Sequence, residues 1–256
     1  MLSRRLMLLP ALAAAHTQPT VDVPGCGKLV GALDPVHAGQ MSFKGIPYAA
    51  PPTKSRRWQV PVPAAPWAPS TLNATAFGNQ CLQGGHTSDG YDESCLFLNV
   101  YAPFPPAPLE RQLPVMLWIH GGAYNYGGSN GYPGASLVAA LQGTVVVVTI
   151  NYRLNVFGFL GSHEVQSRSA RSTAGNFGIE DQRAAMLWVR EHIAPFGGNP
   201  ENVTIFGESA GGNSVINHLA QPASFGLVLK TRNYCALKTR NCASKVMDFA
   251  VREGDC

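Results

Sequence analysis

The residues best suited to chemistry in this 256-residue chain surround Ser209. They read Gly207-Glu208-Ser209-Ala210-Gly211, the G-x-S-x-G pattern of a serine on a sharp strand-to-helix turn. The two glycines allow the turn to close without clashes, and the turn exposes the serine hydroxyl above a sheet. The bare pattern is weak, because Gly and Ser are common in loops. Here it lies between a β-branched run, 203–206, and a helix-like stretch, 210–220, so Ser209 is the candidate nucleophile.

A second glycine-rich segment, His120-Gly121-Gly122-Ala123, could stabilise a developing negative charge. It follows an apolar run, at the place where hydrolases with a serine turn of this kind carry their oxyanion loop. The N–H groups of Gly121, Gly122 and Ala210 would each contribute about 3 kcal/mol to such stabilisation. An ordinary glycine-rich turn is the alternative interpretation. The pairing with Ser209 favours an oxyanion hole.

Three apolar runs must position these segments, and each is short, β-branched and nearly continuous, which is typical of strands buried in a parallel sheet. The runs are 115–119, 144–150 and 203–206. Helix-like stretches alternate with them, at 135–142, 179–193 and 210–220. The alternation predicts an α/β fold with a mostly parallel, doubly wound sheet. Strand-like composition at 27–48 and 93–101 predicts an antiparallel start.

The stretch 179–193 is expected to be an amphipathic helix that ends before Pro195. Its predicted apolar face consists of Ile179, Met186, Leu187, Val189 and Ile193.

The order of the motifs resembles that of the type-B carboxylesterases and cholinesterase-like proteins. The resemblance covers roughly residues 27–227, and it is specific because many motifs occur in the same order. They are 43–49 (FKGIPYA), 93–101 (ESCLFLNVY), 120–123 (HGGA), 151–154 (NYRL), 175–178 (GNFG), 181–182 (DQ), 196–200 (FGGNP) and the Ser209 turn. The resemblance implies the N-terminal half of an α/β-hydrolase fold, with Ser209 hydrolysing a small-molecule carboxylic ester through an acyl-enzyme. It implies no cofactor and no metal.

The same resemblance implies three structural supports. They are a disulfide between Cys81 and Cys95, an ion pair between Arg57 and Glu93, and an ion pair between Arg153 and Asp181. Ser94 stands where the family usually has Asp, a difference that is expected to cost little.

The resemblance stops after residue 227. Residues 228–256 hold six basic and three acidic residues with three cysteines, and we expect an unrelated, disordered basic tail without a strand. In the hydrolase fold the triad follows the order Ser, Asp or Glu, then His. His218 is the one histidine after Ser209, but nine residues along a helix place it on the opposite side, about 13 Å away. We therefore expect His218 to be a packing or surface histidine and not the general base. Because no other histidine follows Ser209, we expect the chain to be inactive on its own. The strand before Ser209, 202–207, is expected to have an exposed edge, because the strand that pairs with it in the hydrolase fold comes later in the chain.

The N-terminus is typical of a secretory signal over residues 1–15, with Arg4 and Arg5 before the apolar run 6–12 and Ala13-Ala14-Ala15 as the cleavage site. An organelle-targeting leader is the alternative. Of the two glycosylation triplets, Asn73-Ala74-Thr75 lies in a polar loop and is the expected site. The triplet that begins at Asn202 runs into an apolar strand and is expected to matter only for structure.

Composition excludes several classes. The chain is 45% hydrophobic and 13% charged, so it can form a core and is poor in charge. Its net charge of +4 comes from the two ends, and the body, 16–227, is close to neutral. Neither nucleic acid nor an anionic membrane is therefore an expected partner. No segment is long enough to span a bilayer, and no protein partner is predicted.

The sequence leaves three interpretations open for the domain at 16–227. The first is a partial serine esterase. The second is a non-catalytic, secreted, cholinesterase-like binding module, against which the intact Ser209 argues. The third is a gene-model fragment without a stable product.

Overall fold

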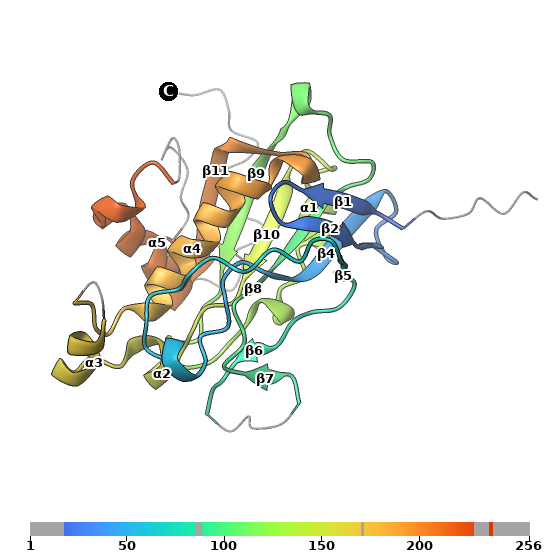
Figure 1. Ribbon diagram of the computed structural model, residues 1–256. Helices are drawn as coiled ribbons and strands as arrows, with labels where there is room; N and C mark the ends of the chain where they lie inside the picture. The colour runs from blue at the N-terminus through green and yellow to red at the C-terminus, as the bar shows by residue number, and fades with distance from the viewer. Residues whose placement is uncertain (1–17, 85–88, 170–171, 228–235, 238–256) are drawn as a thin grey trace, which may run out of the picture.

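The computed structural model describes residues 18–84, 89–169, 172–227 and 236–237 (Figure 1). Its main element is a seven-stranded sheet with the order β12-β11-β9-β10-β8-β4-β3. The strands are β3 (Ala32–Leu33), β4 (Gln40–Pro47), β8 (Phe97–Pro103), β9 (Leu113–Ile119), β10 (Val146–Ile150), β11 (Gly198–Glu208) and β12 (Ala236–Leu237). Strands β10, β9, β11 and β12 pair in parallel, whereas β3, β4, β8 and β10 pair antiparallel. The predicted α/β fold with an antiparallel start is confirmed.

The central strands are apolar on both sides because each side of the sheet has its own core. In β9, Val115, Leu117 and Ile119 belong to the larger core, and Met116 and Trp118 belong to the smaller one. Successive side chains of a strand point to opposite faces, so a strand between two cores must be continuously apolar. This explains why the runs do not alternate with polar residues.

Helices cover both faces of this sheet. Helix α1 (Ala135–Ala140) contributes Ala135 and Val138 to the smaller core. Helices α4 (Phe177–His192) and α5 (Ala210–Ala220) contribute Met186, Val189 and Val215 to the larger core. Figure 1 shows α4 and α5 beside each other on that face. The sheet is therefore doubly wound, as predicted.

One expected core residue of α4 is wrong. Leu187 is 40% exposed, whereas Ile179, Met186, Val189 and Ile193 are at most 4% exposed. At 100° per residue, Leu187 lies 160° around the helix from Val189 and 120° from Ile193, so it points away from the buried side. Trp188, which is 5% exposed, is buried instead.

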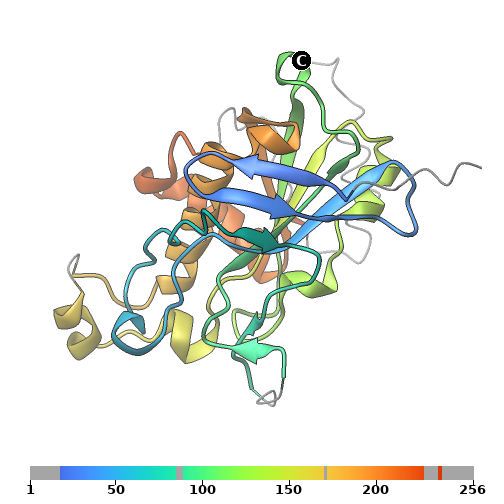
Figure 2. The same cartoon turned by 45° about the vertical axis from the view of Figure 1, so that its right-hand side comes forward.

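Smaller elements lie beside the main sheet. A three-stranded sheet consists of β1 (Thr20–Val23), β2 (Gly27–Val30) and β5 (Thr71–Asn73), and Figure 2 shows it in front of the main sheet. Strands β6 (Gln80–Cys81) and β7 (Tyr91–Asp92) pair in parallel. Two short helices, α2 (Asn155–Phe159) and α3 (His163–Arg168), connect β10 to α4.

The tail differs from expectation at one place. Ala236 and Leu237 form β12, which pairs in parallel with Gly207 and Glu208 of β11. The N–H and C=O groups at the edge of β11 can pair with any extended segment nearby, which gives a physical reason for this strand. Within the described residues the edge of β11 is thus covered only at its end. The rest of 228–256 and the expected signal segment, 1–15, lie outside the described residues.

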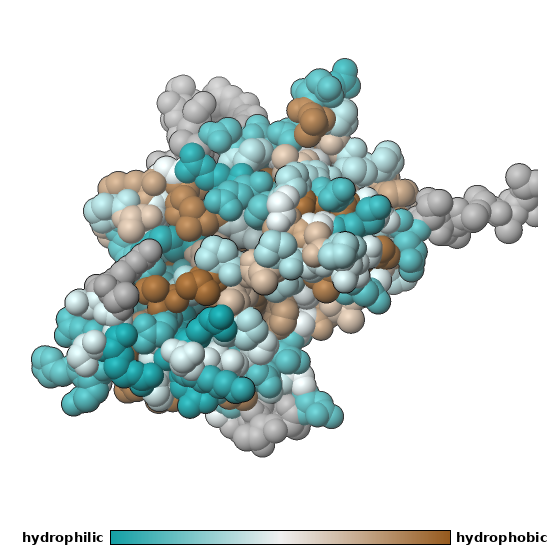
Figure 3. All heavy atoms as spheres, in the orientation of Figure 1, coloured by the Kyte–Doolittle hydropathy of each residue, from teal (hydrophilic) through white to brown (hydrophobic). Residues whose placement is uncertain are grey.

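The surface contains isolated apolar side chains. Figure 3 shows hydrophobic residues in separate clusters among hydrophilic ones on the face of Figure 1. Among the described helices, none combines the length and apolar character needed to cross a membrane.

Candidate active site

Ser209 occupies the turn between β11 and α5. Its backbone has φ 54° and ψ −119°, a conformation that residues other than glycine rarely adopt. Such strain costs about 1–3 kcal/mol and persists only where the surrounding structure imposes it. The turn also places Ser209 directly before the first residue of α5, so its side chain lies at the N-terminal end of that helix.

Close packing around this turn requires the flanking glycines. A Cβ atom on Gly211 would lie 2.0 Å from the carbonyl oxygen of Ile119, and one on Gly207 would lie 2.5 Å from the carbonyl carbon of Gly211. Both distances are far below van der Waals contact. The first turn of α5 can therefore rest on the end of β9 only because these positions carry no side chain.

The His120–Ala123 loop lies against the same turn. Gly207 pairs with Ile119 in the parallel register of β11 and β9, so the residues after both strands emerge at one edge of the sheet. A Cβ atom on Gly121 would lie 3.1 Å from Cβ of Ser209. The structure thus brings together the two segments that the sequence singles out, although they are far apart in the chain.

The N–H groups expected to form an oxyanion hole are available. Within the described part of the chain, neither Gly121 nor Gly122 donates its N–H to a backbone carbonyl. Ala210 begins α5, and the first N–H groups of a helix have no partner within the helix. Gly122 has φ 107°, and its carbonyl accepts from the N–H groups of Asn125 and Tyr126, which holds the loop in a tight turn.

His120 supports the loop from inside. Its ring stacks on Tyr152 at 4.4 Å, and the Tyr152 hydroxyl donates to the carbonyl of His120 at 2.7 Å. Nδ1 of His120 lies 2.8 Å from the carbonyl oxygen of Gly121, which can only accept, so Nδ1 carries the proton. Burial lowers the pKa of His120 to about 4, which keeps the ring neutral. Nε2 has no hydrogen-bond partner among the described residues, and therefore does not accept a hydrogen bond from Ser209.

His218 does not face Ser209 either. It is 3% exposed, and its two nitrogens lie 2.9 Å from Oε1 of Gln182 and 3.0 Å from Oγ of Ser224. Of the two alternatives the sequence left open, packing and surface, the structure shows a buried position, with hydrogen bonds that the sequence did not indicate. No histidine among the described residues hydrogen-bonds to Ser209.

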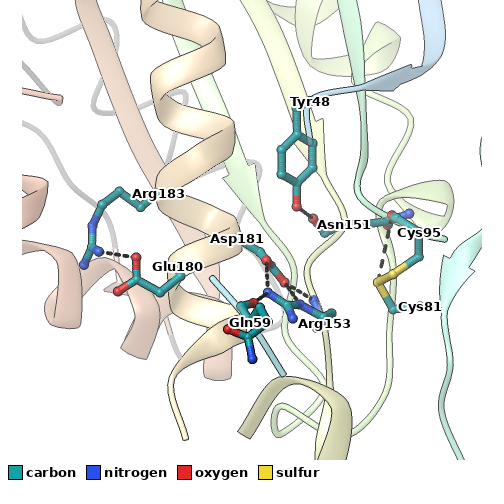
Figure 4. Close-up of polar contacts among 9 residues, drawn as sticks. All are labelled: Tyr48, Gln59, Cys81, Cys95, Asn151, Arg153, Glu180, Asp181 and Arg183. Carbon is teal, nitrogen blue, oxygen red and sulfur yellow. Dashed lines mark hydrogen bonds and ion pairs between the residues drawn. A yellow bond between two sulfur atoms is a disulfide. The ribbon is translucent and has the colours of Figure 1, made fainter. Parts of the chain in front are cut away.

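A buried ion pair fixes the chain after β10 to α4. Nε and Nη2 of Arg153 donate to the two carboxylate oxygens of Asp181, both at 2.7 Å, and the Arg153 N–H donates to the same group at 3.0 Å (Figure 4). Nη2 of Arg153 also donates to the carbonyl of Gln59 at 2.9 Å. This pairing ties three separate segments beneath the site.

A partly exposed support lies near the disulfide. Nε and Nη2 of Arg57 donate to the two carboxylate oxygens of Glu93, the first at 2.5 Å. Two residues further on, Cys95 forms a disulfide with Cys81 (Figure 4). Both contacts hold the loop that includes β7 against the body of the molecule.

Sequence reasoning missed several polar residues close to Ser209. Ser214 Oγ lies 3.0 Å from the Ala210 carbonyl oxygen and 3.2 Å from the Tyr124 hydroxyl, and it accepts from Nε2 of Gln182 at 3.0 Å. The motif Asp181-Gln182 pointed to the region but not to this network. No group of three or more His, Cys, Asp or Glu side chains that could hold a metal occurs among the described residues.

Comparisons with known proteins agree with this geometry. The family model described as the carboxylesterase family matches residues 17–231. The chain is 46% identical over 213 residues to the para-nitrobenzyl esterase of Bacillus subtilis, and 41% identical over 228 residues to the bile salt-activated lipase of Homo sapiens. These alignments cover 80% and 85% of this chain, but 41% and 28% of the relatives.

Solved structures give the same result. A carboxylesterase of Geobacillus stearothermophilus matches with a TM-score of 0.73 and 43% identity, over 84% of this chain and 42% of that one. The chain thus spans less than half the length of the relatives it matches. From the family model, the identities and the shared α/β-hydrolase fold together, it follows that this chain belongs to the carboxylesterase family.

Proposed function

We propose that this chain supplies the nucleophile and the oxyanion donors of a serine-dependent hydrolase of small-molecule carboxylic esters. The observation that carries the proposal is the position of Gly121 against the strained Ser209 at one edge of the sheet, where neither Gly121 nor Gly122 donates its N–H to a backbone carbonyl of the described residues. This is the geometry that stabilises charge on a carbonyl oxygen.

The proposed reaction has two steps. Oγ of Ser209 attacks the ester carbonyl carbon, the oxygen becomes negative and accepts from the N–H groups of Gly121, Gly122 and Ala210, and the alcohol then leaves. Water hydrolyses the acyl-enzyme in the second step and releases the acid. A base must take the serine proton in the first step, and protonate the alcohol as it leaves.

We further propose that the chain alone has little esterase activity. Both buried histidines near the site are engaged elsewhere, His120 with Gly121 and His218 with Gln182 and Ser224. A serine hydroxyl without a base is a poor nucleophile at neutral pH. The retained Ser209 turn favours a catalytic role over a non-catalytic binding module, as do the N–H groups of Gly121 and Gly122, which have no backbone acceptor among the described residues.

The two proposals can be tested separately with 4-nitrophenyl acetate and added imidazole as an external base. The purified chain should show little turnover alone, and imidazole should restore a Ser209-dependent part. The Ser209→Ala variant corrects for hydrolysis by imidazole itself. Ser209-dependent turnover without imidazole would contradict the proposal that the chain lacks a general base. Equal rates with imidazole for the unmodified chain and Ser209→Ala would contradict the proposal that Ser209 is the nucleophile.

The remaining expectations concern cellular location. We propose that residues 1–15 direct the chain to the secretory pathway and that Asn73 carries a glycan there. Asn73 is the last residue of strand β5 and does not lie in the expected loop, but its side chain is exposed, which supports its modification.

A further inference from the structure

A chain of buried polar side chains runs behind the Ser209 turn. It connects α4, α5 and the short 3₁₀ helix η5 (Pro222–Ser224). Its members are at most 9% exposed, and they are Gln182, Arg183, Ser214, His218 and Ser224. Buried polar groups are stable only when they are hydrogen-bonded. The donor and the acceptor in each contact can therefore be assigned from the chemistry of the two partners.

The protonation of His218 follows from its partners. Oε1 of Gln182 can only accept, and it lies 2.9 Å from Nε2 of His218, so Nε2 carries the proton. The amide nitrogen of Gln182 is then directed to Ser214 Oγ, at 3.0 Å. The orientation of one side-chain amide is therefore fixed by His218 on one side and Ser214 on the other.

The other ring nitrogen of His218 must accept. Nδ1 lies 3.0 Å from Ser224 Oγ, which itself accepts from Nε of Arg183 at 3.1 Å. The Ser224 hydroxyl therefore donates to Nδ1. Burial and the positive charge of Arg183 lower the pKa of His218 to about 4, so the ring is neutral at neutral pH. Glu180 pairs with Arg183 at 2.6 Å.

At the other end the network reaches both halves of the proposed site. A hydroxyl has one proton and a carbonyl only accepts, so all contacts are satisfied when Ser214 donates to Ala210 and Tyr124 donates to Ser214. Ala210 follows Ser209 directly, and Tyr124 lies two residues after Gly122. The Ser214 hydroxyl thus forms a hydrogen-bonded link between the His120–Ala123 loop and α5.

We propose that His218 is a positioning residue of the Ser209 site. Its neutral, Nε2-protonated ring orients the Gln182 amide by a hydrogen bond to Oε1. The amide nitrogen of Gln182 in turn donates to the Ser214 hydroxyl and fixes its orientation. This hydroxyl holds the segments of Ala210 and Tyr124 next to each other. The proposal rests on the function proposed above for Ser209, Gly121, Gly122 and Ala210. It gives His218 a role other than that of a general base.

The first test is the protonation state of His218, measured by ¹⁵N NMR on the whole chain. The expected result is a neutral ring with the proton on Nε2 from pH 7 to pH 5. A proton on Nδ1, or a charged ring at pH 7, would overturn the direction of the network and with it the proposal.

The second test uses a matched pair of variants. An amide nitrogen of Gln occupies nearly the position of Nε2, and that of Asn nearly the position of Nδ1. His218→Gln should keep the contact with Gln182, and His218→Asn should lose it. We expect the amide of Asn213, which donates to the carbonyl of Ser209 at 2.9 Å, to exchange with solvent on the order of tenfold faster in His218→Asn and to remain near its original rate in His218→Gln. His163→Asn, on exposed α3, is the control.

Unchanged Asn213 exchange in a folded His218→Asn variant would overturn the proposal, because a packing role alone would lower the melting temperature without this local effect. If His218→Asn does not fold, Tyr124→Phe removes only the hydroxyl that joins the loop to Ser214. This variant should change the chemical shift of the Ala210 amide, and an unchanged shift would overturn the proposal. None of these readouts depends on turnover. Failure of the imidazole experiment would therefore remove the proposed function and leave the network measurable by itself.

Discussion

The guanidinium of Arg153 and the carboxylate of Asp181 meet through two parallel hydrogen bonds in the interior, where the two side chains are 3% and 0% exposed. The first prediction follows from this pair. Removing one partner leaves an uncompensated buried charge, so Asp181→Asn should lower the free energy of unfolding by about 3–5 kcal/mol. Urea unfolding measures the change. Glu201→Gln, the same chemical change on an exposed residue, should stay within about 0.5 kcal/mol. Similar losses in both variants would contradict the prediction.

The second prediction concerns the contact between Gly211 and Ile119. Gly211→Ala forces a methyl group to within 2.0 Å of a backbone oxygen unless α5 moves, and overpacking of this kind costs about 1–3 kcal/mol or more. Gly131→Ala is the matched control, because its Cβ would meet no atom within 4 Å. Thermal unfolding should separate the two variants clearly. Equal melting temperatures would show that α5 does not rest on β9.

The third prediction is a dependence of stability on pH. The pKa of His218 falls from 6.5 to about 4 in the folded chain, so the unfolded chain binds more protons between these values. Stability should therefore be full above pH 6.5, fall on acidification to pH 4, and lose at most about 3 kcal/mol through this residue. His120 has the same shift and adds to the effect. His218→Gln should flatten the curve between pH 6.5 and 4, as followed by denaturant titration. A curve of unchanged slope would contradict the assignment.

The fourth prediction concerns the disulfide between Cys81 and Cys95, which are 14 positions apart. Loop-closure entropy predicts that replacing both with Ser lowers stability by about 3 kcal/mol. Cys26→Ser removes a half-buried thiol that forms no disulfide among the described residues, and should have a small effect. Denaturation under non-reducing conditions compares the variants. A larger loss for Cys26→Ser would argue against the loop as the stabilised element.

The fifth prediction concerns glycosylation in a eukaryotic secretory host. Asn73 is exposed, and its Oδ1 accepts from the hydroxyl of Thr75 at 2.8 Å. We expect a glycosidase-sensitive gel shift that Asn73→Gln removes and Asn202→Gln does not. Asn202 is also exposed, but it directly precedes Val203, which pairs with Val115 inside the sheet. A shift that depends on Asn202 alone would reverse the assignment.

The sheet could be predicted because its strands must be apolar on both sides. A run such as 144–150 cannot be a surface strand, and the runs found by composition coincide with β9, β10 and the second half of β11. The predicted helix 210–220 has the bounds of α5. Strand β12 was not predictable, because two residues have no periodicity and their pairing depends on the free edge of β11.

Only the part of the site that has a local sequence signature could be predicted. A turn such as that at Ser209 has a local signature, since glycines at fixed positions are needed within five residues. The network around Ser214 has none, because its members come from α4, α5 and the loop at Tyr124, and a single Gln or His in a helix looks like any other. Leu187 was misplaced because an apolar side chain alone does not say which side of α4 is buried.

The neighbouring positions of β9 and β11 have a consequence for variation in this molecule. The His120 loop and the Ser209 turn start 87 positions apart in sequence, yet their separation in space is one interstrand spacing, about 4.8 Å. Insertions or deletions in the intervening loops would therefore leave that separation unchanged, provided that the two strands keep their register. A shift of one residue between Ile119 and Gly207 would displace the loop relative to the serine. Tolerance to change should be high along the connection and very low at this one pairing.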